Sequence, residues 1–426
     1  MSARDSERRK AGGRRREAGG ARRKARVGRL AGRTLAKAAG ESGFSVLELL
    51  ISTAIMLTVL AGIFTVMNPA EGTFQAQPEV SDMQQRMRVG VDTLSKEILM
   101  AGAGMYSGQA NGALLNFFAP LVPYRLGLTS PDPPGTFKTD TISLMYVPET
   151  ASQTTIANAM PPTSNELKVN QEAGCPPNDQ LCGFKEGMSL LIFDDTGSYN
   201  TFVVTEVQSS ACHLQRHGPD FNRAYDAGAY VTQMTSHTYY LRSSEAAGLY
   251  QLMHYDGATT DMPVVDNVVG LSFEYFGEPQ PPVLRKPVSD PKGPWTTYGP
   301  KPPALGVSQF NGYADGENCV FEVVAGQHTP RLPDLAPGST NLVPLTAALL
   351  TDGPWCPGPA IPGRFDADLL RIRQVRVRIR VQVGPQMLRG TGSLFTKAGN
   401  AKGGDMWVPD QELRFEVTPR NMNLGR

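Results

Sequence analysis

The sequence predicts an α+β protein in which one long N-terminal α-helix packs on a head of mainly antiparallel strands. Three observations lead to this fold class. An apolar run of 24 residues occupies positions 44–67, a stripe of apolar residues at helical spacing follows it, and segments rich in β-branched and aromatic residues recur from about residue 105 onward. Because the helical patterns come first and the strand patterns afterwards, we expect helix and sheet to form separate layers.

A basic segment, residues 1–43, precedes the apolar run. It holds fourteen Lys or Arg and four acids, a balance of +10, whereas the rest of the chain holds 27 bases and 36 acids, a balance of −9. A basic segment directly before an apolar run is typical of a chain whose N-terminus stays in the cytoplasm while the following part is exported. Nucleic-acid binding by the arginine clusters is the alternative interpretation. The segment lacks apolar periodicity, which predicts disorder.

The apolar run is long enough to cross a membrane. As a helix with a rise of about 1.5 Å per residue it would reach roughly 36 Å, and a hydrocarbon core is about 30 Å thick. A secretory signal peptide has an apolar stretch of only about 7 to 15 residues, with a small residue after it at the cleavage site. Here the stretch is longer and the small residue, Gly43, comes before it. The run therefore predicts a transmembrane helix.

Glu48 is the only ionisable residue in this run. A carboxylate in a membrane helix costs up to about 3 kcal/mol at the bilayer centre and less near an end, so it indicates a functional site. Cleavage after Gly43 would leave a new α-amino group on Phe44, about one helical turn from Glu48. The two opposite charges would then neutralise one another, most usefully between neighbouring subunits of a helical bundle.

The stretch GFSVLELL, residues 43–50, resembles the cleavage and methylation motif of type IV prepilins and of the pseudopilins of type II secretion. The resemblance implies that a prepilin peptidase cuts between Gly43 and Phe44, removes the leader 1–43 and methylates the new amine of Phe44. It also implies that Glu48 is the carboxylate needed for methylation and for docking into a growing fibre. An ordinary signal anchor with a chance acid is the alternative. A leader of this length is long for the family, which leaves open a start codon downstream of Met1.

The stretch 68–104 predicts an amphipathic stem helix. Prolines at positions 69 and 78 predict kinks, and Gly102 and Gly104 predict its end. We expect its apolar face to pack on the following sheet, with a methionine-rich partner groove as the alternative. The residues of that face are Val80, Met83, Met87, Val91, Leu94 and Ile98. The segment 84–108 also resembles, more loosely, the corresponding part of PilW-type minor pilins.

The remainder, 105–426, predicts a β-rich globular head of one or two subdomains. In RIRQVRVRIRVQV, residues 371–383, valine and isoleucine alternate with arginine, which predicts one buried face and one arginine face. We expect the arginines to be solvated or paired across strands, and contact with DNA is the alternative. The expected strands are 140–147, 187–195, 199–208, 230–242, 270–276, 371–383 and 412–421.

Long proline-rich loops are expected to interrupt these strands. The longest, 279–303, cannot form a central strand and predicts an extended surface insertion, while 119–134 and 352–362 are shorter segments of the same kind. The functional alternative is a contact surface for another minor pilin or for a tip adhesin, because proline lowers the entropy cost of ordering.

Five cysteines suggest two disulfides and one remaining thiol in an exported protein. Cys175 and Cys182 flank a turn-forming stretch, which favours a local bridge, and Cys319 with Cys356 is the natural second pair. Reduced buried thiols are the alternative for both pairs. The role of Cys212 stays open.

No catalytic motif stands out. Cys212, His213, His217 and Asp220 offer ligands at close spacing, but the second ligand pair of a zinc site is missing. DDTGSYN, 194–200, lacks the spacing of a calcium loop and is more typical of a hairpin turn. Nucleophile-elbow, zinc-protease and P-loop signatures are absent from the sequence. We therefore expect no catalytic residue, no metal, no cofactor and no enzymatic activity.

The resemblance implies a minor pilin, a structural subunit that acts in assembly, initiation or tip presentation of a type IV pilus. Its partners would be the prepilin peptidase, other pilins or pseudopilins through the helix 44–67, the inner membrane and a tip adhesin, without specific nucleic acid. The chain would cross the bacterial inner membrane once and then enter a periplasmic or extracellular pilus. A J-type pseudopilin of type II secretion is the first alternative, and a membrane-anchored exported enzyme is the second.

Overall fold

The computed structural model describes residues 43–104, 113–148, 152–285, 296–309, 311–401 and 407–423. It shows an α+β protein with one N-terminal helix and mostly antiparallel sheets, which confirms the expected fold class. The chain divides into two units, Met1–Thr65 and Val66–Arg426. Apart from Gly43, the expected leader lies outside the described residues.

The helix α1 runs from Val46 to Met100. It continues through Pro69 and Pro78, so neither proline ends it, and the kinks expected there stay a prediction. In its last five turns the apolar stripe packs into the core of the head, as expected, and the methionines at positions 83 and 87 are core residues. The buried members of the stripe are Met83, Met87, Leu94 and Ile98.

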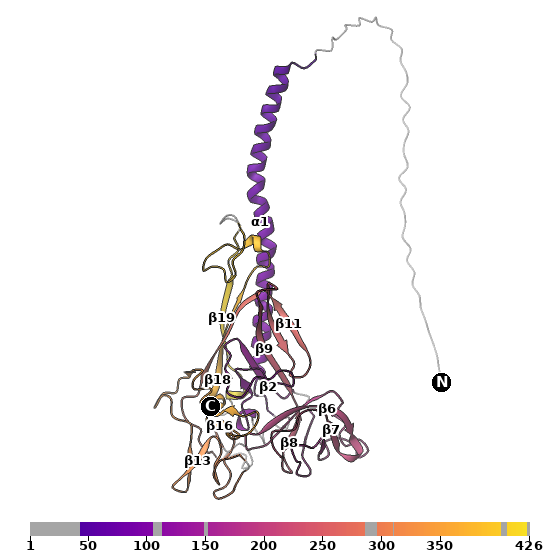
Figure 1. Cartoon of the computed structure of the whole chain (residues 1–426), viewed down its shortest axis with the longest axis vertical. Helices are drawn as coiled ribbons and strands as arrows, with labels where there is room; N and C mark the ends of the chain where they lie inside the picture. The colour runs from indigo at the N-terminus through magenta and orange to yellow at the C-terminus, as the bar shows by residue number, and fades with distance from the viewer. Residues whose placement is uncertain are drawn as a thin grey trace, which may run out of the picture. The chain divides into compact units, whose positions relative to one another are not determined.

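Two antiparallel sheets lie beside this part of α1, and Figure 1 shows β9, β11 and β19 next to it. The five-stranded sheet has the order β1 (Leu121–Val122), β2 (Thr141–Tyr146), β9 (Thr235–Ser244), β10 (Leu249–Tyr255) and β11 (Asp261–Asp266). The four-stranded sheet has the order β15 (Val343–Leu345), β12 (Val268–Gly277), β18 (Ile372–Val381) and β19 (Gln411–Val417). With α1, both sheets enclose one large hydrophobic core.

A third, six-stranded sheet lies to one side, where Figure 1 labels β6, β7 and β8. Its order is β3 (Gln153–Thr155), β8 (Tyr230–Gln233), β5 (Ser189–Phe193), β6 (Tyr199–Gln208), β7 (His213–Arg216) and β4 (Glu166–Lys168). Two small hairpin-like pairs complete the strands, β13 (Phe321–Val324) with β14 (Gln327–Pro330) and β16 (Trp355–Cys356) with β17 (Phe365–Asp366). Short 3₁₀ turns are η2 (Leu114–Asn116), η3 (Ser209–Ala211), η4 (Ala367–Arg371), η5 (Gln386–Leu388) and η7 (Asn421–Asn423).

Strand β5 separates two hydrophobic cores. Leu190 and Ile192 face a core enclosed by the six-stranded sheet, whereas Leu191 and Phe193 belong to the large core around α1. All four side chains are buried. A continuous apolar run is what a strand covered on both faces requires, so the sequence SLLIF matches its position.

Single residues connect the three sheets. The prediction of one strand over 230–242 is wrong. The segment forms two strands, β8 and β9, which belong to different sheets and are separated only by Met234. The Met234 amide donates to the Ser189 carbonyl at 3.1 Å, and the next strand pairs with β2 instead. Asn267 alone separates β11 from β12 and has a φ of 58°, a left-handed conformation that Asn tolerates better than most residues.

The central strand β18 alternates as expected. Its valines and isoleucine from Val375 to Val381 are buried, and the arginines point to the other face. Side chains of β12, of β19 and of the loop before β19 accept hydrogen bonds from these arginines. The pairs are Arg376–Glu274 (3.1 Å), Arg376–Glu416 (2.6 Å), Arg378–Ser272 (3.1 Å) and Arg380–Asp410 (3.0 Å). The arginine face is therefore paired across strands.

The proline-rich segment 279–303 is only partly a surface loop, which corrects the expectation of an extended insertion. Residues 286–295, with Trp295, lie outside the described residues, but Pro279, Pro282 and Tyr298 are buried. The fully buried Arg371 donates to the carbonyl of Pro279 at 3.1 Å, and the Tyr298 hydroxyl donates to that of Gln280 at 2.7 Å. Buried carbonyls need such donors, and Arg371 and Tyr298 supply them.

Gly90 is the point of closest approach between α1 and the sheets. A Cβ there would lie 2.8 Å from the Ile379 side chain, 3.8 Å from Val265 and 3.9 Å from Leu252. Ile379 belongs to the four-stranded sheet and the other two to the five-stranded sheet. The missing side chain therefore lets one turn of the helix contact both sheets at once.

Replacing Gly90 by leucine should push α1 away from both sheets, because overpacking a filled core costs about 1–3 kcal/mol. We expect the free energy of unfolding, measured by chemical denaturation, to fall by that amount. The control is Val89→Leu at the neighbouring position, which is 41% exposed and should leave stability nearly unchanged. Equal stability of the two variants would contradict the close approach.

Candidate functional site

The expected processing motif lies at the start of α1. Phe44 is 86% exposed, and the helix begins two residues later, at Val46. The Ser45 hydroxyl accepts from the Leu47 amide at 3.3 Å, and the Ser45 carbonyl accepts from the Leu49 amide at 3.0 Å. Ser45 thus satisfies one of the free amides of the first turn, as a helix cap does. A Cβ on Gly43 would meet nothing within 4 Å, so local packing does not require glycine there.

Among the described residues, Val46–Met67 is the one helical stretch long and apolar enough to cross a membrane. Its mean hydropathy is 2.3 and none of it is buried. Its leucines, isoleucines and valines are exposed all around the helix. A helix that is apolar on every side is stable only inside a large core or in lipid.

The hydroxyl groups of this stretch are satisfied within the helix. Each donates to a carbonyl three or four residues earlier, at 2.8 to 3.2 Å, so none needs water. These residues are Ser52, Thr53, Thr58 and Thr65. Glu48, in the first turn of α1, has no hydrogen-bond or ion-pair partner within the described part of the chain. The carboxylate is the single polar side chain of the stretch that still requires one.

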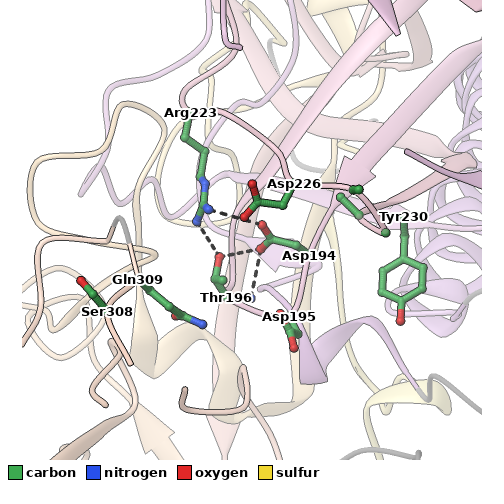
Figure 2. A pocket seen from close by; sticks show the side chains of 11 residues that line it. Asp194, Asp195, Thr196, Arg223, Asp226, Tyr230, Ser308 and Gln309 are labelled. Carbon is green, nitrogen blue, oxygen red and sulfur yellow. Dashed lines mark hydrogen bonds and ion pairs between the residues drawn. The ribbon is translucent and has the colours of Figure 1, made fainter. Parts of the chain in front are cut away.

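A polar cavity of about 370 Å³ lies at the turn between β5 and β6. Figure 2 shows Arg223 pointing toward Thr196 and Asp194. Thr196 donates its hydroxyl to Asp194 at 2.5 Å, and Arg223 donates to the same hydroxyl at 2.9 Å. Burial raises the pKa of Asp194, and the nearby Arg223 lowers it in part. The described lining residues include no histidine, cysteine or lysine.

Residues 194–198 form the hairpin turn between β5 and β6, as expected. Asp194 Oδ1 accepts both the hydroxyl of Thr196 and, at 3.0 Å, its amide, and Oδ2 lies 3.8 Å from Arg223. A second, more apolar cavity of about 650 Å³ is lined by prolines and by Tyr124, Tyr199 and Phe221. In the first cavity the Thr196 hydroxyl lies against the Asp194 carboxylate, and neither cavity is lined by a histidine, cysteine or lysine among its described residues.

The zinc ligands considered from the sequence do not come together. The Cys212 thiol donates to the Gln180 side chain at 2.7 Å, and His213 Nδ1 lies 3.2 Å from the carboxylate of Glu166. His217 and Asp220 are exposed. Within the described residues, these four do not form a cluster at ligand distances.

Three aspartates that the sequence analysis did not single out do lie close together. One carboxylate oxygen from each of Asp352, Asp366 and Asp368 lies within 4.8 Å of the others. Asp366 accepts the amides of Gly353 at 2.6 Å and of Asp368 at 2.8 Å. Asp368 lies 2.6 Å from Arg371 Nε. The two buried carboxylates therefore hold the η4 turn and its arginine, and no sequence pattern predicts that arrangement.

Both disulfides join the pairs suggested by the sequence. Cys175–Cys182 has a Cα–Cα distance of 5.6 Å and Cys319–Cys356 one of 5.1 Å, which are normal for disulfides. Cys212 is a free, partly buried thiol. Because the sulfurs of Cys175 and Cys182 bond each other, they are not ligands for a metal beside Glu172.

Comparison of the chain with protein-family models, with curated proteins and with solved structures finds no match. Functional inference therefore depends on the exposed apolar stretch of α1 and on its unpartnered carboxylate.

Replacing Asp352 by asparagine should stabilise the protein only at higher pH. Burial, with Asp352 as a further cause, raises the pKa of Asp366 to about 6 and that of Asp368 to about 7. A carboxyl with a raised pKa stabilises the fold at low pH, and that stability is lost as the pH rises through the folded-state pKa. Removing the exposed Asp352 charge should recover roughly 0.2–1 kcal/mol at pH 8, and nothing at pH 4.

Chemical denaturation at pH 4, 6 and 8 measures this effect. Asp315→Asn is the matched control, because Asp315 is equally exposed and lies outside the aspartate cluster. A similar gain in both variants, or a gain at pH 4, would contradict the explanation.

Proposed function

We propose that the chain is a minor pilin, a structural subunit of a type IV pilus that acts in assembly, initiation or tip presentation. The observation that carries the proposal is Glu48, an unpartnered carboxylate in the first turn of a fully exposed apolar helix. The motif around it, from Gly43 to Leu50, is the one that resembles type IV prepilins. In this proposal the chain crosses the inner membrane once through 44–67, with the basic leader in the cytoplasm.

Processing follows from the geometry of the N-terminal end of the described chain. The bond between Gly43 and Phe44 precedes the helix and is exposed, so a peptidase in the membrane can reach it. A Cβ at position 43 would meet nothing within 4 Å, and we attribute the glycine to recognition by the peptidase. The product is a mature chain that begins with an amine on Phe44, the residue methylated in this family.

Assembly follows from the charge that remains. The amine on Phe44 would lie about one helical turn from Glu48, and the same pair recurs in every neighbouring subunit. In a bundle of such helices the carboxylate of one subunit binds the amine of the next, which removes two isolated charges from an apolar environment. Apolar side chains around the helix supply the lateral contacts.

Within the described part of the head, no site argues for another function as strongly as Glu48 argues for assembly. The arginines of β18 bind side chains of β12, of β19 and of the loop before β19. Because these arginines have partners within the head, they support a head without specific nucleic-acid binding. Its described cavities are lined by no histidine, cysteine or lysine, and we propose a structural rather than an enzymatic role. A tip adhesin and other minor pilins are the partners we propose for the head.

Mass spectrometry of the protein from its native cell envelope tests processing. We expect a chain that begins with N-methylated Phe44 and lacks residues 1–43. Gly43→Leu should abolish cleavage while leaving the thermal stability of the head unchanged, because a side chain there meets nothing. Recovery of the wild-type protein with its basic leader attached would contradict the proposal.

Replacing Glu48 by alanine tests assembly. Cleavage should persist, while the amount of the subunit in sheared pili should fall at least tenfold, because the amine loses its counter-charge. Thr58→Val is the matched control, since that hydroxyl bonds only carbonyls of its own helix and its loss should not affect incorporation. Normal incorporation of Glu48→Ala would remove the role assigned to the carboxylate.

A J-type pseudopilin of a type II secretion system shares the processing motif and is the alternative. Deleting the gene separates the two functions. Loss of surface pili with normal protein secretion supports the minor pilin, whereas retained pili with loss of secreted proteins from the medium supports the pseudopilin.

A further inference from the structure

Two of the five histidines stack against each other where the C-terminal part of α1 meets the five-stranded sheet. His237 on β9 and His254 on β10 have ring centroids 4.6 Å apart, at an interplanar angle of 70°. His254 also packs on Tyr239, with ring centroids 5.0 Å apart. Strand register explains the stack, because His254 is paired with Tyr239, two residues from His237 on the same face.

One acid of α1 faces this histidine pair. Glu97 Oε2 lies 2.9 Å from His237 Nδ1 and accepts the Tyr146 hydroxyl at 3.3 Å. The side chains of Glu97 and His237 are only 21% and 19% exposed. Glu97 lies one residue from the fully buried Ile98, so its contacts and the apolar stripe fix the same turn of the helix.

The second imidazole has no such acid. His254 Nε2 is buried and has no hydrogen-bond partner among the described residues. Burial first, and His237 second, lower the pKa of His254 below its ordinary value of 6.5, and Glu97, Asp256 and Asp261 oppose this in part. Asp261 is already bound by Arg125 and Tyr240, and Asp256 accepts amides of its own turn.

The groups that face the imidazole pair come from α1 and from three strands of the five-stranded sheet. The helix contributes Glu97, and its neighbour Lys96 pairs with Asp92 in solvent. From the sheet, β2 contributes Tyr146, β9 contributes His237 and Tyr239, and β10 contributes His254. A proton on His254 places a positive charge against the His237 ring, which opposes it, and part of that repulsion falls on the helix–sheet interface.

We propose that Glu97, His237 and His254 form a proton-sensitive latch that holds the C-terminal turns of α1 on the five-stranded sheet and weakens on acidification. The latch stands on the geometry of the head and does not depend on the proposed function. Its consequence for a filament subunit is that the external pH changes how firmly the helix is held by its head.

The sign of the effect follows from proton linkage. Because folding lowers the proton affinity of His254, the unfolded chain binds more protons below about pH 6.5, and stability falls as the pH falls. The aspartates of the η4 turn act in the opposite direction, so the comparison of variants, rather than the wild-type curve alone, isolates the latch.

The decisive variant is His254→Phe in the full-length protein in detergent micelles. Phenylalanine keeps a ring between His237 and Tyr239 but cannot bind a proton. From pH 7.5 to pH 5.5, we expect the unfolding equilibrium constant of the wild type to rise about three- to tenfold more than that of the variant. Hydrogen-exchange protection factors of amides 94–100 should fall on acidification in the wild type and change less in His254→Phe.

The matched control is His213→Gln, which removes the histidine of another His–Glu pair, on β7 and away from α1. It should retain the wild-type pH dependence. Equal pH dependence of wild type and His254→Phe, or an equal reduction in His213→Gln, would overturn the latch. Should His254→Phe fail to fold, Glu97→Gln decides. Glu97 opposes the lowering of the His254 pKa, so its removal must steepen the loss of stability in acid, and an unchanged slope overturns the proposal.

Discussion

The structure depends on one constraint on helix α1. The first part of this helix is exposed and apolar, whereas its second part packs into the core of the head. Up to Met67, α1 is apolar on every side and exposed, and from Met83 onward only one stripe of it is buried. The change is made without ending the helix, even at two prolines. Gly90 allows the second half to contact two sheets at once, so the core of the head forms between the buried stripe of the helix and both sheets. Glu48 and the helix–sheet interface are thereby parts of one element.

Several arginines of the head bind carboxylates and backbone carbonyls of the head itself. Arginines on β18 bind acids of adjacent strands, the fully buried Arg371 binds three backbone carbonyls and Asp368, and Arg216 binds the carbonyls of three surrounding residues. A buried guanidinium needs several acceptors, and irregular proline-rich backbone supplies them without a strand partner. The long loops are therefore anchored by cations, which explains why so much of their proline is buried.

Sequence patterns predicted the parts in which a local period determines burial. The apolar run, the stripe from Val80 to Ile98 and the alternation in β18 follow from helix and strand periods, and the hairpin turn at 194–198 follows from its turn-forming residues. Sequence did not predict the division of 230–242 between two sheets, because a switch at Met234 leaves the composition of both halves strand-like. Nor did it predict contacts made across long separations, such as Arg371 with Pro279, the three aspartates around η4 or the stacked pair His237 and His254. These depend on register between distant strands, which one sequence does not encode locally.

The single-residue joints at Met234 and Asn267 have a mechanical consequence. Met234 joins the six-stranded sheet to the five-stranded sheet, and Asn267 joins the five-stranded sheet to the four-stranded sheet. Each joint is one residue long. A pulling force applied along α1 enters the two sheets packed around it and passes through one residue into the third. Such a head bears tension as a stiff body, because neither joint is long enough to extend before hydrogen bonds in the adjoining strands begin to break.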